Sequence, residues 1–266
     1  MKRLLLPLVL LVAIAAGCGH SNRAPSGAPA TTTAAAPPPS APNTASTSPT
    51  TPATAPTIAV RVYLVRDGRV APVRRLVPDT PAVGQAALDA LRAGPTTAER
   101  ADGLSTAIGL LRLSGLSIRS GEADLGALTH VSELAEAQIV YTLTQFPTVR
   151  KVRIGDDVLE RSDLEDVTPV ILVESPLPGE TVSNPITVRG TSNTFEATMR
   201  VEVRRGSKVL IAETVTASSG SGERGTYAAT LDVDAPRGPI TLVAFEPSAE
   251  NGQPLHTVTV PLTLSG

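Results

Sequence analysis

The sequence predicts two folded domains behind a signal peptide and a disordered stalk: an α+β domain with a mixed sheet and two helices, followed by an all-β sandwich. Three observations support this fold class. A short apolar run opens the chain, and a long segment of Pro, Ala, Thr and Ser follows it. Beyond that segment, the hydrophobic periodicity is first mixed between helix and strand and then, from about residue 168, that of strands alone. A length of 266 residues accommodates this plan.

The N-terminus has the pattern of a secretory signal. Lys2 and Arg3 precede an apolar run at residues 4–16. The run is too short for a permanent membrane helix, which takes roughly 20 residues. Cys18, the single cysteine of the sequence, directly follows small residues. The tetrapeptide Ala-Ala-Gly-Cys at 15–18 resembles the bacterial lipobox, with alanine where leucine is more usual.

That resemblance implies transfer of a diacylglyceryl group to the Cys18 thiol and removal of a signal peptide at residues 1–17. We therefore expect a lipoprotein on the outer face of the cytoplasmic membrane, held there by acyl chains in which each buried CH₂ contributes about 0.8 kcal/mol. A plain secretory signal that ends near a cysteine is the alternative.

Residues 18–57 are predicted to form the lipidated cysteine and a disordered stalk. From residue 21 onward this segment contains no Val, Ile, Leu or aromatic residue, and Arg23 is its only charge. It therefore has too little apolar surface to offset the entropy lost on ordering. A glycosylated or wall-threading stalk is an alternative that the Thr, Ser and Pro content also fits.

The α+β domain is expected at residues 58–162. Asp67-Gly68 suits the positive φ angles of a type I′ turn and predicts a hairpin. Thr80 is expected to cap the first helix, which ends at Gly94. The expected strands are 60–66, 69–77, 110–119, 122–125 and 148–154, and the second helix is 131–145. That helix is expected to bury one mostly apolar face, made of Leu134, Ala135, Gln138, Ile139 and Thr142.

An acidic connector at 163–166 leads to the second domain, expected at residues 168–266. Met199, Val201 and Val203 alternate with charged residues, as in a strand with one buried face. Short strands separated by Gly, Pro and Asn turns predict an immunoglobulin-like sandwich without its disulfide. The seven expected strands are 170–173, 186–191, 199–205, 208–215, 226–233, 240–245 and 255–264.

Four segments of the first predicted domain carry a resemblance: VYLV at 62–65, ALRAGPT at 90–96, GLSTAI at 103–108 and AQIVYTLTQFP at 137–147. With them the domain resembles the sporulation and germination domain called GerMN. The last segment is the most specific, because it is long and ordered.

The second predicted domain contains SP at 175–176, NPI at 184–186, GT at 190–191, FEA at 195–197, GTY at 225–227, FE at 245–246 and VPL at 260–262. In these segments it is similar to the immunoglobulin-like domain of bacterial spore germination, which often follows GerMN. Together the resemblances imply an envelope lipoprotein with no known catalytic residues, which binds a protein or ligand outside the membrane. They do not imply a role in spores.

Motifs with a chemical interpretation are few. The Gly-x-Gly-x-x-Gly string at 220–225 joins two expected strands, whereas a dinucleotide site needs it between a strand and a helix, so we expect a hairpin loop. His20, His130 and His256 lack a further metal ligand at a suitable spacing, and His256 is expected in the core or at its rim. We expect no catalytic residue, metal or cofactor, and therefore a protein that is not an enzyme.

Two Phe-Glu pairs are the candidate binding residues: Phe195, Glu196, Phe245 and Glu246. They are expected either to place both carboxylates around an aromatic anchor at one end of the sandwich, or to pack and pair locally. A basic strand face, formed by Arg200, Arg204, Arg205 and Lys208, is expected to be solvated, although it also suits an anionic wall polymer or lipid head groups.

The sequence thus predicts a non-enzymatic protein-binding or scaffold module of the cell envelope, tethered to the membrane through its lipid anchor. A binding module for a small ligand or cell-wall glycan, with a cleft between the domains, is the alternative. A hydrolase acting on wall material is a third interpretation, for which the sequence offers no convincing carboxylate pair. A formal net charge of −2 and an aromatic content of 2% argue against nucleic acid as a partner.

Overall fold

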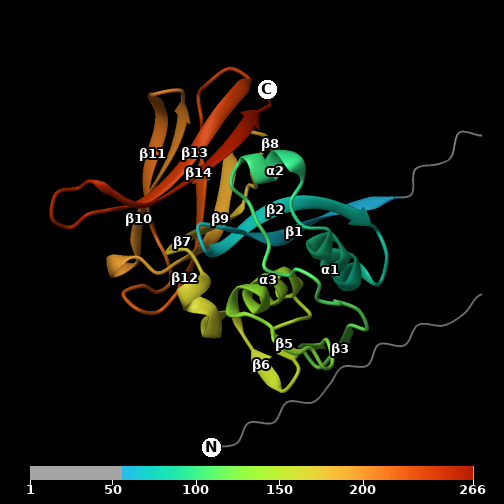
Figure 1. Cartoon of the computed structure of the whole chain (residues 1–266). Helices are drawn as coiled ribbons and strands as arrows, with labels where there is room; N and C mark the ends of the chain where they lie inside the picture. Colours follow the sequence, from blue (N-terminus) through green and yellow to red (C-terminus); the bar gives the residue numbers. More distant parts are fainter. Residues whose placement is uncertain (1–55, 266) are drawn as a thin grey trace, which may run out of the picture. The chain divides into compact units, whose positions relative to one another are not determined.

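The computed structural model describes residues 56–265, and Figure 1 shows their helices and strands. They belong to one compact unit, Pro52–Gly266. The predicted signal peptide, Cys18 and the stalk up to residue 55 lie outside the described residues. None of the helices within 56–265 combines the length and apolarity needed to cross a bilayer.

The first domain opens with a long antiparallel hairpin of β1 (Thr57–Arg66) and β2 (Arg69–Pro78). Asp67 and Gly68 join the strands with φ angles of 50° and 72°. Positive φ at both central residues is the requirement of a type I′ turn. The predicted hairpin is therefore confirmed.

The first helix, α1 (Val83–Ala93), begins later than predicted. Ala82 occupies the position before the helix, and its N–H donates to Thr80 Oγ1 at 3.2 Å. Thr80 thus stabilises the preceding turn, and its prediction as the helix cap is wrong. Gly94, with φ of 70°, ends the helix as expected.

The second predicted helix is α3 (Glu133–Leu143), with Ser132 as its cap. The predicted face is buried, with Leu134 half-buried, but burial extends around the helix to almost every position from Ala135 to Leu143. A helix surrounded by protein needs no polar stripe, so its sequence shows little amphipathic periodicity. A short helix that was not predicted, α2 (Thr97–Ala101), begins with a capping box of Thr96 and Glu99.

A second sheet of the first domain has the order β3-β4-β5-β6. Its strands are β3 (Ser117–Arg119), β4 (Glu122–Asp124), β5 (Lys151–Ile154) and β6 (Asp157–Leu159). The pair β4–β5 is parallel and the others are antiparallel, which confirms a mixed sheet. β6 was not predicted, and the predicted strand is wrong over residues 110–116. Gly109 and Gly115 turn the chain there with φ of 54° and 80°, and Leu110 is fully exposed.

The second domain consists of two packed antiparallel sheets, as the sequence predicts. All seven expected strands are present, together with a short parallel strand, β8. The sheet orders are β11-β10-β13-β14-β8 and β12-β9-β7. The strands are β7 (Ile171–Ser175), β8 (Thr181–Val182), β9 (Ile186–Ser192), β10 (Thr198–Arg205), β11 (Lys208–Thr216), β12 (Gly225–Leu231), β13 (Gly238–Pro247) and β14 (Pro254–Leu264).

The predicted connector at 163–166 lies within a 3-10 helix, η1 (Arg161–Val167). A second one, η2 (Phe195–Ala197), precedes β10. In η1, Leu164 is fully buried and belongs to the core of the first domain. The segment between the domains is therefore part of the packing.

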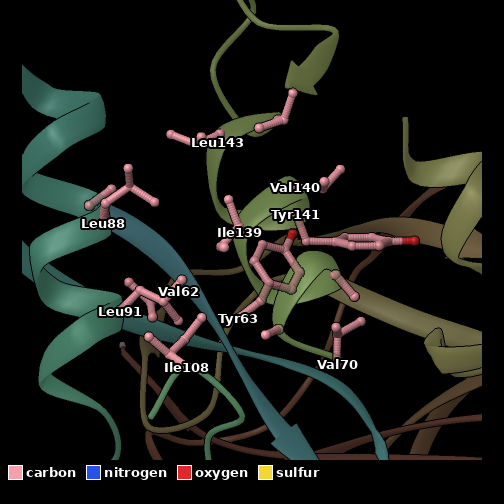
Figure 2. Close-up of a cluster of buried hydrophobic side chains, with 14 of the residues drawn as sticks. Val62, Tyr63, Val70, Leu88, Leu91, Ile108, Ile139, Val140, Tyr141 and Leu143 are labelled. Atoms are coloured by element: carbon pink, nitrogen blue, oxygen red, sulfur yellow. The ribbon is translucent and has the colours of Figure 1, made fainter. Parts of the chain in front are cut away.

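The two domains have separate cores that meet at β7. In the first core, Leu88 and Leu91 of α1 point toward Val62 of β1 and Ile139 of α3 (Figure 2). Leu172 of β7 joins this core, whereas its neighbours 171 and 173 belong to the core of the sandwich. Because successive side chains of a strand point to opposite faces, β7 is buried on both sides and is shared by the domains.

β7 and β9 approach closely at Gly190. A Cβ at this position would lie 1.9 Å from the carbonyl oxygen of Leu172 and 2.7 Å from the hydroxyl of Tyr227. Tyr227 is the cross-strand partner of Gly190, and its hydroxyl donates to that same carbonyl at 3.2 Å. Only glycine leaves room for this ring, which explains the residue in the middle of a strand.

Candidate functional site

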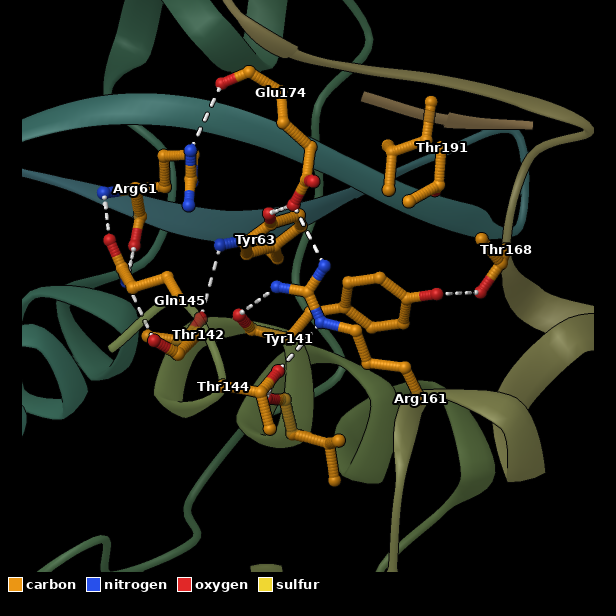
Figure 3. Close-up of polar contacts among 12 residues, drawn as sticks. Arg61, Tyr63, Tyr141, Thr142, Thr144, Gln145, Arg161, Thr168, Glu174 and Thr191 are labelled. Atoms are coloured by element: carbon orange, nitrogen blue, oxygen red, sulfur yellow. Dashed lines mark hydrogen bonds and ion pairs between the residues drawn. The ribbon is translucent and has the colours of Figure 1, made fainter. Parts of the chain in front are cut away.

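Along the edge of β1, side chains from α3 and from Gln145, two residues beyond its end, take the place of a neighbouring strand (Figure 3). Thr142 Oγ1 accepts from the Tyr63 N–H at 3.2 Å, and Gln138 Nε2 donates to the Tyr63 carbonyl at 2.8 Å. Gln145 Oε1 accepts from the Arg61 N–H at 2.7 Å, and its Nε2 donates to the Arg61 carbonyl at 2.6 Å. The spacing of four and three residues keeps these side chains on one helix face. The outward backbone N–H and C=O groups of Tyr63 and Arg61 therefore all have hydrogen-bond partners.

A buried carboxylate joins the two domains (Figure 3). Glu174 of β7 accepts hydrogen bonds from the Tyr63 hydroxyl and, at 2.9 Å, from Arg161 Nη1. Arg161 also donates through Nε to Thr144 Oγ1 at 2.7 Å, and its guanidinium lies 4.5 Å from the centre of the Tyr141 ring. The side chains of Glu174 and Arg161 are only 13% and 24% exposed. This ion pair is therefore a structural contact across the domain junction.

The junction favours the ionised state of the carboxylate. Burial raises the pKa of Glu174, but the Arg161 charge and the Tyr63 hydroxyl outweigh it and hold that pKa below its ordinary value. Burial and the neighbouring Glu174 charge raise the pKa of Tyr63, which therefore stays protonated as the donor. A charged carboxylate with these partners is in the state that best stabilises the joint.

Beside this contact lies a cleft of about 370 Å³, which we call the junction cleft. Residues of both domains line it: Ile58, Ala59, Val60, Arg61, Arg74, Gln145, Phe146, Glu174, Ser175, Leu177 and Glu180. Pockets at domain interfaces of roughly 300–1,000 Å³ are common ligand sites. The junction cleft is thus the candidate functional site.

Two arginines face each other across the hairpin at this cleft. Arg61 and Arg74 are cross-strand partners. The backbone groups of Arg61 bond to Gln145 and so point away from β2, which makes this a non-hydrogen-bonded pair with Cα atoms about 4.5 Å apart. Arg74 Nε lies 3.4 Å from Glu180 Oε1. Arg61 Nη1 donates to the Glu174 carbonyl at 3.4 Å, and its buried Nε has no partner among the described residues.

The comparisons with protein families identify both domains. A family described as sporulation and spore germination matches residues 61–155, and one described as the immunoglobulin-like domain of bacterial spore germination matches residues 170–253. The chain contains a spore germination domain followed by the immunoglobulin-like domain of bacterial spore germination. Both resemblances predicted from the sequence are confirmed.

Solved structures are similar to parts of the chain. One contains the tandem GerMN domains of the sporulation protein GerM from Bacillus subtilis, with 23% identity over 37% of this chain and a TM-score of 0.33. Another is an engineered protein, with 20% identity over 43% of this chain and a TM-score of 0.28. The matches cover 38% and 22% of those two chains, respectively. No curated protein matches the chain.

The structure brings three of the four candidate residues of the immunoglobulin-like domain close together. Glu246 Oε1 accepts from the Phe195 N–H at 2.9 Å, and the Glu196 N–H donates to Ser221 Oγ at 2.9 Å. The Phe195 ring is 58% exposed, whereas Phe245 is 7% exposed and lies within β13. One aromatic side chain is therefore free at the surface, and one carboxylate is engaged in a local cap.

The other sequence features have local roles. Glu202 lies between two arginines of the predicted basic face, 3.1 Å from Arg200 Nε and 2.8 Å from Arg204 Nε. His256 is exposed and lies 3.8 Å from Glu246. No cluster within residues 56–265 has three side chains suited to hold a metal ion. Cys18 lies outside the described residues.

The glycine-rich string supplies a second clamp between the domains. It connects β11 and β12, as expected, and its Arg224 donates from Nε and Nη2 to the carboxylate of Glu165 in η1, at 2.7 and 2.8 Å. The same guanidinium donates to the Pro169 carbonyl at 2.8 Å. The loop therefore holds the connector and does not form a nucleotide site.

Sequence reasoning missed Arg61, Arg74, Arg161 and Glu174. Arg61 and Arg74 lie in expected strands, whereas Arg161 and Glu174 lie just outside the expected connector and strand. Important partners are remote in sequence; Tyr63 and Glu174 are 111 residues apart. One signal was present. The run Val-Ile-Leu-Val at 170–173 lacks the alternation of a half-exposed strand, which is typical of a strand buried on both faces.

Proposed function

We propose that this protein is a non-enzymatic, lipid-anchored binding module on the outer face of the cytoplasmic membrane, and that its two domains together hold a protein of the cell envelope. The observation that carries the proposal is the buried contact of Glu174 with Tyr63 and Arg161. It fixes the germination domain against the immunoglobulin-like domain, so that the junction cleft has two walls of constant geometry. Preorganised walls lower the entropy lost on binding.

The mechanism is presentation of this cleft to a partner. Acyl chains on Cys18 hold the protein at the membrane, and the Pro-rich stalk sets its reach, up to roughly 100 Å if it is extended at about 3.1 Å per residue. The buried charges at the junction serve the joint, since Glu174, Arg161 and the Tyr63 hydroxyl bond to one another. Because these charged groups are engaged with one another, the site suits binding of a partner rather than catalysis.

Cross-linking in cells that express the full chain tests this proposal. Proteins attached to residues 58–266 are identified by mass spectrometry, beside a Cys18→Ala form that lacks the anchor. We expect one or two envelope proteins, recovered at lower yield from the Cys18→Ala cells. Recovery of nothing above background from the wild-type chain would refute the proposal.

A binder of small ligands or wall glycans is the second candidate function, because about 370 Å³ is enough for a small molecule. Phe146 is the one aromatic side chain that lines the cleft within the described residues, which gives sugar rings little to stack on. Titration of the full chain with soluble muropeptides decides this point. Saturable binding that Arg61→Gln weakens would favour the second candidate.

A further inference from the structure

We infer that the junction cleft binds an extended, acidic segment of the partner protein, with a carboxylate between Arg61 and Arg74 and an apolar side chain beside it. This inference rests on the proposed function, because it names the part of the partner that the cleft recognises. Charge, the open edge of β1 and the exposed apolar residues around it support the inference independently.

The cleft lining contains two arginines and two glutamates, but both carboxylates are already engaged. Like charges directly opposite each other on a sheet are destabilising, yet Arg61 and Arg74 occupy such a position. Glu180 lies beside Arg74 and also accepts from the Leu177 N–H at 3.0 Å. Glu174 is paired with Arg161. Within the described residues, the Arg61 guanidinium therefore has a carbonyl oxygen as its hydrogen-bond partner, and a carboxylate suits its planar group of donors.

The edge of β1 is open where it enters the cleft. The backbone groups of Arg61 and Tyr63 point to this edge and are satisfied by side chains. By strand alternation the N–H and C=O of Ala59 point the same way, and they have no partner within the described part of the chain. An extended segment that pairs with Ala59 therefore gains two backbone hydrogen bonds, as in strand addition.

Apolar side chains lie near Ala59 on both strands of the hairpin and in the cleft. Ile58 is 43% exposed, and Leu76, the cross-strand partner of Ala59, is 59% exposed. Phe146 and Leu177 line the same cleft. Exposed apolar side chains next to a positive charge fit a segment in which an acidic residue neighbours an aliphatic one.

The chain's own stalk as the occupant, and a second hollow as the site, fit these observations less well. The chain's own stalk contains no Asp or Glu between residues 21 and 57, so it has no side-chain carboxylate for these arginines. A second hollow, of about 480 Å³, is lined by Arg66 and Arg74 but also by Glu99 and Asp102. The Asp102 carboxylate makes no ion pair within the described residues, so it would repel an acidic segment there.

Site-specific photo-cross-linking of the full chain in cells tests the inference. A photoreactive amino acid replaces Ala59 in the cleft or, in a separate strain, Val209 on β11, which is 43% exposed. The cross-linked partner peptide is sequenced by mass spectrometry. The Ala59 strain is repeated with Arg61→Gln plus Arg74→Gln, and with Arg119→Gln as a matched control, because Arg119 is exposed and outside the cleft.

We expect an adduct at Ala59 whose partner peptide carries Asp or Glu next to an aliphatic residue. Its yield should fall about tenfold in the double variant, as for loss of a paired charge at an interface, and stay unchanged in the Arg119→Gln control. A synthetic copy of that peptide should bind the full chain about tenfold more tightly than its amide analogue, with Asn or Gln for Asp or Glu.

Three outcomes overturn the inference. An Ala59 adduct without an acidic residue, or one insensitive to both arginines, excludes the acidic segment. A protein adduct at Val209 with none at Ala59 excludes the cleft but leaves the proposed binding function intact. No protein adduct at either position contradicts both the inference and the proposed function. Matching thermal unfolding of all variants shows that the fold is retained.

Discussion

Replacing Glu174 by Gln tests whether the junction holds the two domains together. Gln has nearly the same shape and still accepts from the Tyr63 hydroxyl, but it leaves the Arg161 guanidinium without its counter-charge. Removal of one partner of a buried ion pair costs about 3–5 kcal/mol. We expect the lower end, about 3 kcal/mol, because Arg161 retains 24% exposure and some hydration. For a chain of this size the melting temperature should fall by about 6–12 °C.

The measurement is thermal unfolding of the full chain followed by circular dichroism. Glu250→Gln is the matched control, because Glu250 is exposed and its carboxylate makes no hydrogen bond or ion pair within the described residues. Glu174→Gln combined with Arg161→Met should recover part of the loss, since no buried charge is then unpaired. If Glu174→Gln and Glu250→Gln differ by less than about 0.5 kcal/mol, the junction contact does not stabilise the protein.

The stabilisation by the Glu174 contact should disappear at acidic pH. The folded protein holds the pKa of Glu174 below its unfolded value, so the unfolded chain binds more protons as the pH falls. The stabilisation is present above the unfolded pKa, about 4.3 for Glu, and is lost as the pH falls through the folded value. Comparing wild type with Glu174→Gln removes the effect of other carboxylates. A stability gap that stays constant from pH 7 to pH 2 contradicts this argument.

Three further substitutions test the packing and the candidate residues, each by urea unfolding of the full chain. Gly190→Ala should cost about 3 kcal/mol or more, because its Cβ would overlap the Leu172 carbonyl; a smaller loss would show that β7 and β9 separate easily. Gln138→Met should cost about 2 kcal/mol or more, since the Tyr63 carbonyl loses its partner; an unchanged midpoint would mean that water replaces the amide. Glu196→Gly should leave the free energy of unfolding within about 0.5 kcal/mol of wild type. Glycine relieves the strain of a φ of 53°, which offsets the greater conformational entropy that it gives the unfolded chain; a large loss of stability would indicate a further contact of the Glu196 side chain.

Features with local causes could be predicted from the sequence. The β1–β2 hairpin depends on the turn at Asp67-Gly68, and the strands of the sandwich depend on alternation, as at Met199, Val201 and Val203, all fully buried. Both signals lie within a few neighbouring residues. The prediction that Thr80 caps the first helix is wrong because its hydroxyl accepts from the Ala82 N–H in the turn before α1.

The residues of the candidate site have partners that are distant in sequence, so the sequence predicts a cleft between the domains only as an alternative and does not name the residues that line it. Gln138 and Thr142 are fully buried on the predicted helix face, but only the backbone of β1 explains why these buried positions are polar. Their spacing with Gln145 was visible in the sequence, and a polar stripe within an apolar helix indicates pairing with a strand edge. Arg61 and Arg74 become a pair only through the register of the hairpin.

The boundary between the two families is not a boundary in the packing. Residues 156–169 lie outside both family matches, yet Leu164 belongs to the core of the germination domain, and Glu165 is clamped by Arg224 of the immunoglobulin-like domain. β7 is buried on both faces, with Leu172 in one core and its neighbours in the other. Separating the domains at the connector would therefore expose apolar surface in the germination domain and remove a wall of the junction cleft. Because that cleft exists only when both domains are in place, a partner bound there recognises the tandem as a whole.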